Sequence, residues 1–484
     1  MDVIRKRYQT RKRKKLFKSF IIVVWVLLMG SPSLKAQQYY TLYWMQGIPQ
    51  SMQSNPALQP NVNFYLGFPA ASSVYAGAFH TGFALQDLIK RNEMTETFYI
   101  NEQSMLAALK DRNFLTAEYS HEWLTFGFRS GKNYYSLNVS DHLSGRFAYP
   151  KDLMYLLLEG NYHFVQEDRP ANFGGLAMDM LHYRELGLSF SRHWSDNLSA
   201  GIRAKFLQGQ ANISFNDSKL DITTQPSFFE LLLESDLGFN TNLPFAVAPL
   251  DSLGSSEFID FNNDEEILSY LTNPLDQGFA VDLGVVYKPF DRFTIAASAR
   301  DLGFINWKSN PENFRLTGEF EFEGLELNDF FEEGSDFEGE SFTDSIVDLF
   351  SREETANEYT LMLPTKLFAS VAFDLTDMHK LALLGGGQFY SGAFYPSFTA
   401  SYNFQPINHF GTALSYSVVN GNFNNVGFGA HLDLAFLQLY LVFDNFFGAT
   451  RPHTLQTFTV HFGVNIVAGH KKREKDPVEP SFRW

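Results

Sequence analysis

The sequence predicts an all-β fold, a transmembrane antiparallel β-barrel of more than ten strands, on the basis of three features. Stretches with apolar residues at every second position recur along the chain, and each can form a strand with one apolar and one polar face. Aromatic residues are abundant, yet the mean hydropathy is only -0.18, as expected for a barrel in which lipid-facing and lumen-facing residues alternate. The N-terminus has the pattern of an export signal.

Residues 1–36 are predicted to be a cleaved signal peptide. Basic residues precede an apolar core over Phe20–Met29, and we place the cleavage site between Ala36 and Gln37. An uncleaved anchor helix is the alternative, but the apolar core is shorter than the roughly 20 residues that span a bilayer. Cleavage removes ten basic residues and one acid, which leaves 28 basic and 53 acidic residues. We expect so acidic a chain to bind no nucleic acid.

The clearest strand covers Thr457–Ile466, near the C-terminus. Its apolar residues, Phe458 through Ile466 at every second position, would face lipid, and the polar phase would put His461 and Asn465 in the lumen. We expect this segment to be the closing strand, which pairs with an early strand so that no edge is left exposed.

Charged residues in the predicted strands fall on the polar phase. A soluble β-sandwich would turn the same polar faces of its strands toward solvent, so the positions of the charged residues alone do not distinguish a sandwich from a barrel. The export signal, the aromatic content and the number of strands favour the barrel. The candidates for lumen-facing residues are then Arg203, Lys205, Asp282, Arg300, Asp374, Asp433 and His461.

The predicted barrel extends over residues 63–469, with helices and one acidic insertion in its loops. The insertion spans residues 309–358, and its part from Glu312 to Glu358 holds 16 acidic residues, so we expect a long mobile loop. Residues 470–484 are expected to form a flexible periplasmic tail. Short amphipathic helices are predicted at Asn101–Leu109, Lys151–Glu159, Ser227–Glu234, Asp264–Leu271 and Thr343–Ser351.

Catalytic and cofactor motifs are weak in this sequence. The absence of cysteine excludes disulfides and thiolate metal sites. Ser140 and His142 lie two residues apart on one predicted strand, without a third group to orient them, so a structural role is expected. The acidic stretch 260–271 resembles a calcium loop but lacks its glycine and its final glutamate. We therefore expect no enzyme activity, no cofactor and no dedicated metal site.

Several stretches together resemble an uncharacterised Bacteroidota family of exported outer-membrane β-barrels. They lie at residues 48–58, 149–153, 182–185 and 300–307, and span nearly the whole mature chain. The turn Asn55-Pro56-Ala57 is also similar to the N-terminal segment of the FadL and PorV group of barrels. This resemblance implies about 14 strands, within a range of 12 to 16. It also implies that residues 37–62 form a luminal plug, with Asn55, Pro56 and Ala57 as its motif.

The resemblance implies two alternative functions in the cell outer membrane. A FadL-like barrel would passively pass a small hydrophobic molecule through an aromatic-lined lumen when the N-terminal segment shifts. A PorV-like barrel would instead be a scaffold that docks periplasmic or surface proteins without transport. Both alternatives place the barrel wall against outer-membrane lipid.

Overall fold

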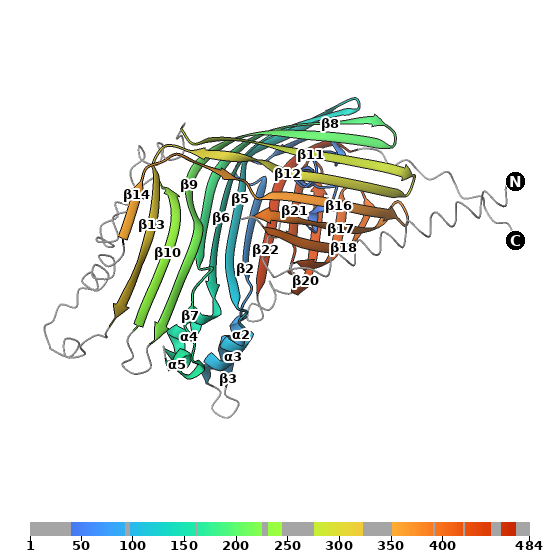
Figure 1. Cartoon of the computed structure of the whole chain (residues 1–484). Coiled ribbons are helices and arrows are strands. Elements are labelled where there is room, and N and C mark those ends of the chain that lie inside the picture. The colour runs from blue at the N-terminus through green and yellow to red at the C-terminus, as the bar shows by residue number, and fades with distance from the viewer. Residues whose placement is uncertain are drawn as a thin grey trace, which may run out of the picture.

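The computed structural model describes residues 40–91, 97–160, 162–224, 231–243, 275–322, 351–390, 393–419, 422–446 and 456–470. These residues form a closed antiparallel barrel of 14 strands (Figure 1), which confirms the predicted fold class. The predicted signal peptide and the tail after His470 lie outside the described residues.

Two of the fourteen positions in the wall are each occupied by a pair of short strands. β1 (Val62–Gly67) and β2 (Ser73–His80) both pair with the same two neighbours, as one interrupted strand. β15 (Tyr359–Met362) and β16 (Thr365–Asp374) likewise share β12. The other wall strands are β5 (Arg112–Ser130), β6 (Asn133–Pro150), β8 (Ala177–Ser195), β9 (Leu198–Thr224), β11 (Gln277–Phe290), β12 (Phe293–Trp307), β17 (His379–Tyr390), β18 (Ala393–Ile407), β19 (Phe410–Val419), β20 (Asn422–Leu434), β21 (Leu437–Phe443) and β22 (Thr457–His470).

β22 closes the barrel, as the sequence predicts. It pairs with β21 on one side and with β1 and β2 on the other, with Val62 opposite His470 and Ala78 opposite Phe458. Its residues alternate along the strand: His461 and Asn465 are buried, whereas the side chain of Phe462 is exposed on the outer face. The period-two pattern of the sequence therefore sets which residues face inward.

The outer face of the wall is apolar around the barrel. On β11, the exposed residues Phe279, Leu283 and Val285 alternate with buried Ala280 and Asp282. The same alternation exposes large apolar side chains on other wall strands, including Leu188, Ile202, Ile295, Leu367, Leu381, Leu414 and Leu441. A continuous belt of such residues would be unfavourable in water, and it matches the surface of a barrel embedded in lipid.

The two ends of the barrel differ in their connections. Six hairpins are joined by only two to four residues at one end, which we call the short-turn end: 131–132, 196–197, 291–292, 375–378, 408–409 and 435–436. The described chain also enters the wall at Val62 and leaves it at His470 at this end, because these residues pair. Longer connections, such as residues 81–111 and 151–176, lie at the opposite loop end.

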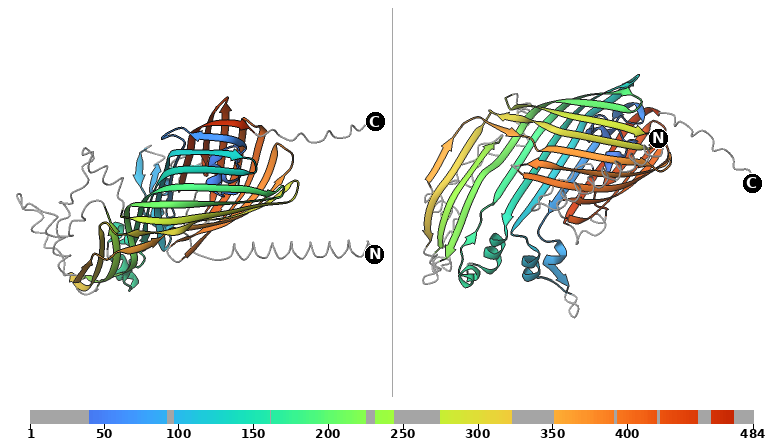
Figure 2. Two further views of the ribbon diagram at one scale, coloured as in Figure 1. Left: turned by 90° about the horizontal axis from the view of Figure 1, so that it is seen from above. Right: turned by 45° about the vertical axis from the view of Figure 1, so that its right-hand side comes forward.

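A sheet extends from the barrel wall to one side, which the sequence did not predict. β9 continues past the barrel and pairs with β10 (Leu231–Asn242), which pairs with β13 (Pro311–Phe322) and then β14 (Ser351–Thr355) (Figures 1 and 2). Two predictions are therefore wrong. The helix predicted at Ser227–Glu234 is replaced from Leu231 onward by a strand, and the insertion at 309–358 is a strand at both of its described ends.

Short helices cover the loop end of the barrel and lie below β5, β6 and β7 in Figure 1. α3 (Glu102–Ala108) and α4 (Lys151–Glu159) confirm two predicted helices, and Asn101 caps α3 by accepting a hydrogen bond from the Ser104 backbone N–H at 2.8 Å. The remaining elements here are α2 (Leu85–Leu88), α5 (Tyr162–Glu167), β7 (Ala171–Asn172) and a hairpin of β3 (Ile89–Arg91) and β4 (Phe98–Ile100). The predicted helix Asp264–Leu271 lies outside the described residues. The predicted helix Thr343–Ser351 also lies outside them, except for Ser351, which is the first residue of β14.

None of the helices in the described ranges is both long enough and apolar enough to cross a membrane.

Candidate functional site

The N-terminal segment, residues 40–61, lies inside the barrel and fills the short-turn half of its lumen. It contains two short 3-10 helices, η1 (Leu42–Trp44) and η2 (Pro49–Gln53), and nearly all of its residues are buried. Its apolar side chains pack against alanine and leucine residues on the inner face of the wall, including Ala296, Ala372 and Leu384. The segment predicted to be a plug therefore has the packing of a core element.

The turn Asn55-Pro56-Ala57 is held on both sides. The Asn55 side-chain amide donates to the Tyr43 hydroxyl at 3.1 Å and to the Ala297 carbonyl at 3.2 Å, and its oxygen accepts from the Ala57 N–H at 2.9 Å. Two wall glycines make this approach possible. A Cβ at Gly201 would lie 2.4 Å from the Pro56 oxygen, and a Cβ at Gly284 would lie 2.1 Å from Asn55 Oδ1.

Polar contacts fasten the rest of the N-terminal segment to the wall. Thr41 shares a hydroxyl hydrogen bond with Ser415 at 2.8 Å, and its N–H donates to Asp444 at 2.9 Å. Gln50 and Asn465 form a reciprocal amide pair in which each donates to the other at 2.9 Å. These bonds satisfy polar groups that would otherwise be buried without partners, so they hold the segment in one position.

The interruption between β1 and β2 lies beside this amide pair. Residues 68–72 leave the strand, and Ala70 has a left-handed backbone with a φ of 59°. The Ser72 carbonyl accepts hydrogen bonds from Gln50 at 3.2 Å and from the Tyr440 hydroxyl at 3.0 Å. The wall is therefore held here by contacts to the N-terminal segment in addition to its strand pairing.

A layer of charged side chains crosses the middle of the lumen. The ammonium group of Lys205 lies 3.2 Å from Glu185, 3.0 Å from Asp282 and 2.5 Å from Asp301, and all four residues are buried. Arg203 adds an ion pair with Asp282 at 3.4 Å. Because these charges are removed from water, each depends on its partners for stabilisation.

The predicted lumen-facing residues occupy three different places. Arg203, Lys205, Asp282 and Arg300 belong to the charged layer, and His461 lies beside Ser73, with its Nε2 atom 2.7 Å from the Ser73 hydroxyl. Asp374 and Asp433 lie toward the short-turn end. Asp374 is half-buried and pairs with Lys380 at 3.6 Å, whereas Asp433 is buried.

Further charged residues near this layer were not among the sequence candidates. Glu185 follows the alternation of β8. It could have been predicted to face inward, because it directly precedes Leu186, the first outward-facing residue of the apolar row. Asp301 could not, because Arg300 and Asp301 are consecutive and both buried, and Asp301 has a left-handed φ of 59°. His142, expected to be structural, lies 3.6 Å from Glu185, and Ser140 accepts a hydrogen bond from Asn138 at 3.0 Å.

A cavity of about 520 Å³ lies on the loop-end side of the charged layer. Asp301 and Arg300 from the layer line one part of it, together with Lys366, whose ammonium group lies 3.8 Å from the Asp301 carboxylate. The rest of its lining is mixed. Apolar and aromatic side chains in the lining include Leu181, Tyr183, Leu363 and Tyr395. The lumen thus contains, in order from the loop end, a cavity, a charged layer and the N-terminal segment.

Comparison with solved structures finds barrels at low sequence identity. The toluene transporter TbuX of Ralstonia pickettii is 10% identical, with 86% of this chain and 92% of that chain covered and a TM-score of 0.35. A FadL homologue of Pseudomonas aeruginosa is 11% identical, with 91% and 100% covered and a TM-score of 0.38. The toluene transporter TodX of Pseudomonas putida is 9% identical, with 91% and 95% covered and a TM-score of 0.35.

No curated protein matches this sequence. A family model does match it, over residues 56–444, from Pro56 in the N-terminal segment to the residue after β21. That range contains most of the barrel wall, all of the charged layer and the residues that line the cavity. The protein therefore belongs to a family of unknown function, DUF5723.

Proposed function

We propose that the protein is an outer-membrane channel that passively passes a small hydrophobic molecule through its lumen. The export signal in the sequence and the apolar belt around the wall support this location. The single observation that carries the function is the cavity at the loop end of the lumen, which is closed toward the short-turn end by the charged layer and the N-terminal segment.

The lining of the cavity indicates the kind of molecule that it would take. A volume of about 520 Å³ is in the range of small-molecule sites. Leu181 and Leu363 offer apolar surface, and the rings of Tyr183 and Tyr395 offer flat contact surface. A ring or short chain would pack on these residues, and any polar group that it carries would turn toward Asp301 and Lys366.

Passage requires the N-terminal segment to move, because it fills the lumen beyond the charged layer. Transport would be passive, driven by the concentration gradient of the molecule. The segment is held by a limited set of hydrogen bonds, each worth about 0.5–1.5 kcal/mol net. Moving the segment would break the Thr41–Ser415, Gln50–Asn465 and Asn55–Ala297 contacts and part of its apolar packing, but none of the hydrogen bonds between wall strands.

Uptake by reconstituted vesicles tests this proposal. The mature protein in liposomes should increase entry of a small aromatic hydrocarbon above that of empty liposomes. A variant that lacks residues 40–60 should alter this entry, because the segment that closes the short-turn half is gone. Equal entry into empty vesicles, wild-type vesicles and vesicles with the truncated protein would contradict the proposal, provided that circular dichroism shows a folded barrel in each sample.

A scaffold that docks partner proteins is the second candidate. It is favoured by the sheet of β10, β13 and β14 that extends from the wall, which we call the lateral sheet. In the described residues β14 pairs only with β13. A strand edge of this kind can accept a strand from another chain. A partner that co-purifies at one copy per chain, and is lost when β14 is deleted, would support docking over transport.

A further inference from the structure

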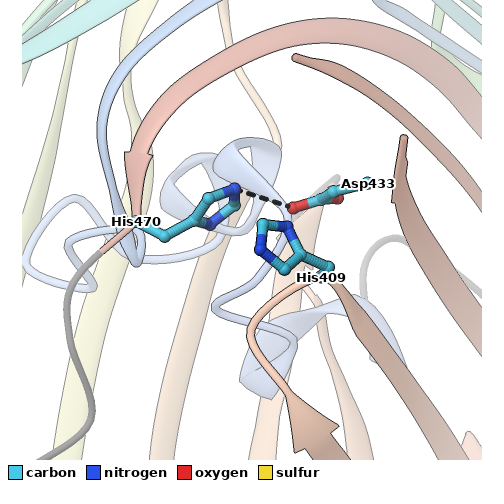
Figure 3. A group of neighbouring side chains, drawn as sticks. All are labelled: His409, Asp433 and His470. Atoms are coloured by element: carbon cyan, nitrogen blue, oxygen red, sulfur yellow. Dashed lines mark ion pairs between the residues drawn. The ribbon is translucent and has the colours of Figure 1, made fainter. Parts of the chain in front are cut away.

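Three potential metal ligands meet at the short-turn end of the barrel, apart from the cavity and the charged layer. His409 lies in the β18–β19 turn, Asp433 lies near the end of β20, and His470 is the last residue of β22. Figure 3 shows the three side chains pointing toward one another from these separate segments. One ligand atom from each lies within 4.8 Å of the other two.

We propose that His409, Asp433 and His470 form a binding site for a divalent transition-metal ion such as Zn²⁺. Two imidazole nitrogens and a carboxylate oxygen are a donor set that suits zinc, and hard cations such as Ca²⁺ prefer oxygen ligands. Three protein ligands would leave a fourth position for water or another small ligand.

The geometry of the pair between Asp433 and His470 supports this assignment. Asp433 Oδ2 and His470 Nε2 lie 3.4 Å apart, and two ligands of a tetrahedral zinc ion with bonds of about 2.0–2.1 Å are separated by roughly the same distance. Both atoms are shielded from solvent, and neither has a hydrogen-bond partner among the described residues. Buried polar atoms normally have partners, so a bound ion would explain both.

The third ligand requires a small adjustment. The His409 ring lies 4.5 Å from the His470 ring, centroid to centroid. Its side chain is exposed and belongs to a two-residue turn, so it can move without disturbing the packing of the wall. The backbone is already anchored beside the site, because the Asp433 N–H donates to the His409 carbonyl at 2.8 Å.

A second side chain orients the carboxylate. Gln438 Nε2 donates to Asp433 Oδ1 at 2.8 Å, which leaves Oδ2 for the ion. The same Gln438 amide donates to the Gly47 carbonyl of the N-terminal segment at 2.8 Å. Hydrogen bonds of this kind around a metal site typically change metal affinity by about 10–100-fold. A bound ion would therefore also fix a contact between the wall and the N-terminal segment.

The site would also stabilise the closure of the barrel. His470 lies opposite Val62, where the first and last strands of the wall meet. An ion that joins His470 to β20 and to the β18–β19 turn would hold the end of β22 in place. Metal binding should therefore raise the thermal midpoint of the barrel, and the rise should grow with the logarithm of the ion concentration above the dissociation constant, since the folded state alone contains the assembled site.

Metal titration of the full-length mature protein, prepared without a histidine tag and treated with EDTA, tests the proposal. Co²⁺ should bind at one ion per chain with the visible absorption of a tetrahedral site, and Zn²⁺ should displace it. The variants His409→Ala, Asp433→Asn and His470→Ala should lose this binding, and Gln438→Leu should weaken it by about 10–100-fold.

His379→Ala is the matched control. His379 also lies at the short-turn end, but its Nδ1 atom is hydrogen-bonded to the Tyr402 hydroxyl at 2.6 Å. It should bind metal as wild type does. His409 is exposed, so its variant should stay folded, which heat-modifiable migration on a gel will show. Failure to bind at micromolar metal, or equal binding by wild type and the folded His409→Ala and His470→Ala variants, would overturn the proposal and leave an ion pair only.

Discussion

Lys205 is the residue on which the charged layer of the lumen depends most. Its ammonium group contacts the carboxylates of Glu185, Asp282 and Asp301 within 3.2 Å, and its side chain is almost completely buried. Without this cation, the three buried carboxylates would repel one another in a medium of low polarity. Removing one partner of a buried ion pair typically costs about 3–5 kcal/mol, because the remaining charge is left uncompensated.

Replacing Lys205 with methionine should therefore lower the free energy of unfolding by about 3–5 kcal/mol. The measurement is urea unfolding in detergent, followed by tryptophan fluorescence. Lys288→Met is the control, since Lys288 is exposed beside a turn and its replacement should change stability by less than about 0.5 kcal/mol. If the two variants unfold alike, the layer does not depend on Lys205.

The sequence predicted part of the charged layer at this scale, for a clear reason. Arg203, Lys205 and Asp282 lie on strands whose alternation is regular, so the polar phase identifies them as inward. Asp301 breaks this rule, because its left-handed backbone places it inside next to Arg300. The pairing register also shifts between Val281 and Leu283. A bulge of this kind cannot be read from apolar spacing alone.

The metal ligands escaped the sequence analysis for another reason. Asp433 was assigned to the lumen, but His409 lies in a turn and His470 at the end of a strand, 37 residues further along the chain than Asp433. Metal motifs are recognised when ligands are close in sequence. These three meet only when the barrel closes, so their proximity follows from the strand pairing.

In the proposed channel, the N-terminal segment is the element that would determine whether the lumen is open. Its turn at Asn55–Ala57 rests on backbone where the wall has Gly201 and Gly284, and neither position has room for a side chain. At Gly201 the fit is one of backbone against backbone, so it cannot be relieved by rotating a side chain. Overpacking at such a contact typically costs about 1–3 kcal/mol.

Gly201→Ala should therefore displace the turn and expose the N-terminal segment to protease. Its new Cβ would lie 2.4 Å from the Pro56 oxygen, whereas at Gly145, also in the wall, a Cβ would meet nothing within 4 Å. Limited proteolysis, read by mass spectrometry, should show faster cleavage within residues 40–61 for Gly201→Ala than for Gly145→Ala. Equal cleavage would mean that the turn does not depend on this glycine.

The helix α4 carries a pH-dependent contact at the loop end. Burial raises the pKa of Asp152, but hydrogen bonds from Arg169 at 2.6 and 3.0 Å and from the Asn172 N–H outweigh it, so the pKa lies below its usual value. A carboxyl with a lowered pKa in the folded state stabilises above its unfolded pKa of about 3.9, and this stabilisation is lost as the pH falls through the folded pKa.

Amide hydrogen exchange over residues 151–172, corrected for its intrinsic pH dependence, should therefore show protection that falls below about pH 4. In Asp152→Asn the amide cannot ionise, so protection should be lower at pH 6 and should change little on acidification. An identical acid-induced loss in wild type and variant would assign the effect to other groups.

The strands of the lateral sheet could not be predicted from the sequence. The sequence predicts a short amphipathic helix at Ser227–Glu234, and a short apolar run such as Leu231–Leu233 fits a helix as well as a strand. The stretch Glu319-Phe320-Glu321-Phe322 does alternate at period two, but the high acidic content of the region indicated a loop. Both segments are strands because they extend β9, a long-range pairing that their own residues do not specify.

The whole molecule combines a closed wall with a filled lumen. The wall could be predicted because every strand repeats the same alternation, and closure follows from the need to leave no exposed edge. The filling could not be derived from alternation, since residues 40–61 have no regular period. The proposed transport would then depend on one relative motion, between the N-terminal segment and the wall that surrounds it.

A disulfide lock tests this motion most directly, because the chain contains no cysteine. Thr41→Cys with Ser415→Cys joins the start of the N-terminal segment to β19, where the two hydroxyl oxygens lie 2.8 Å apart. Thr399→Cys with Ser417→Cys is the matched control, with hydroxyl oxygens 2.9 Å apart on two neighbouring wall strands. We predict that oxidation lowers uptake of a small aromatic hydrocarbon into proteoliposomes to the level of empty liposomes for the first pair only, and that reduction restores it. Undiminished uptake by the fully oxidised first pair would contradict passage through a lumen gated by the N-terminal segment.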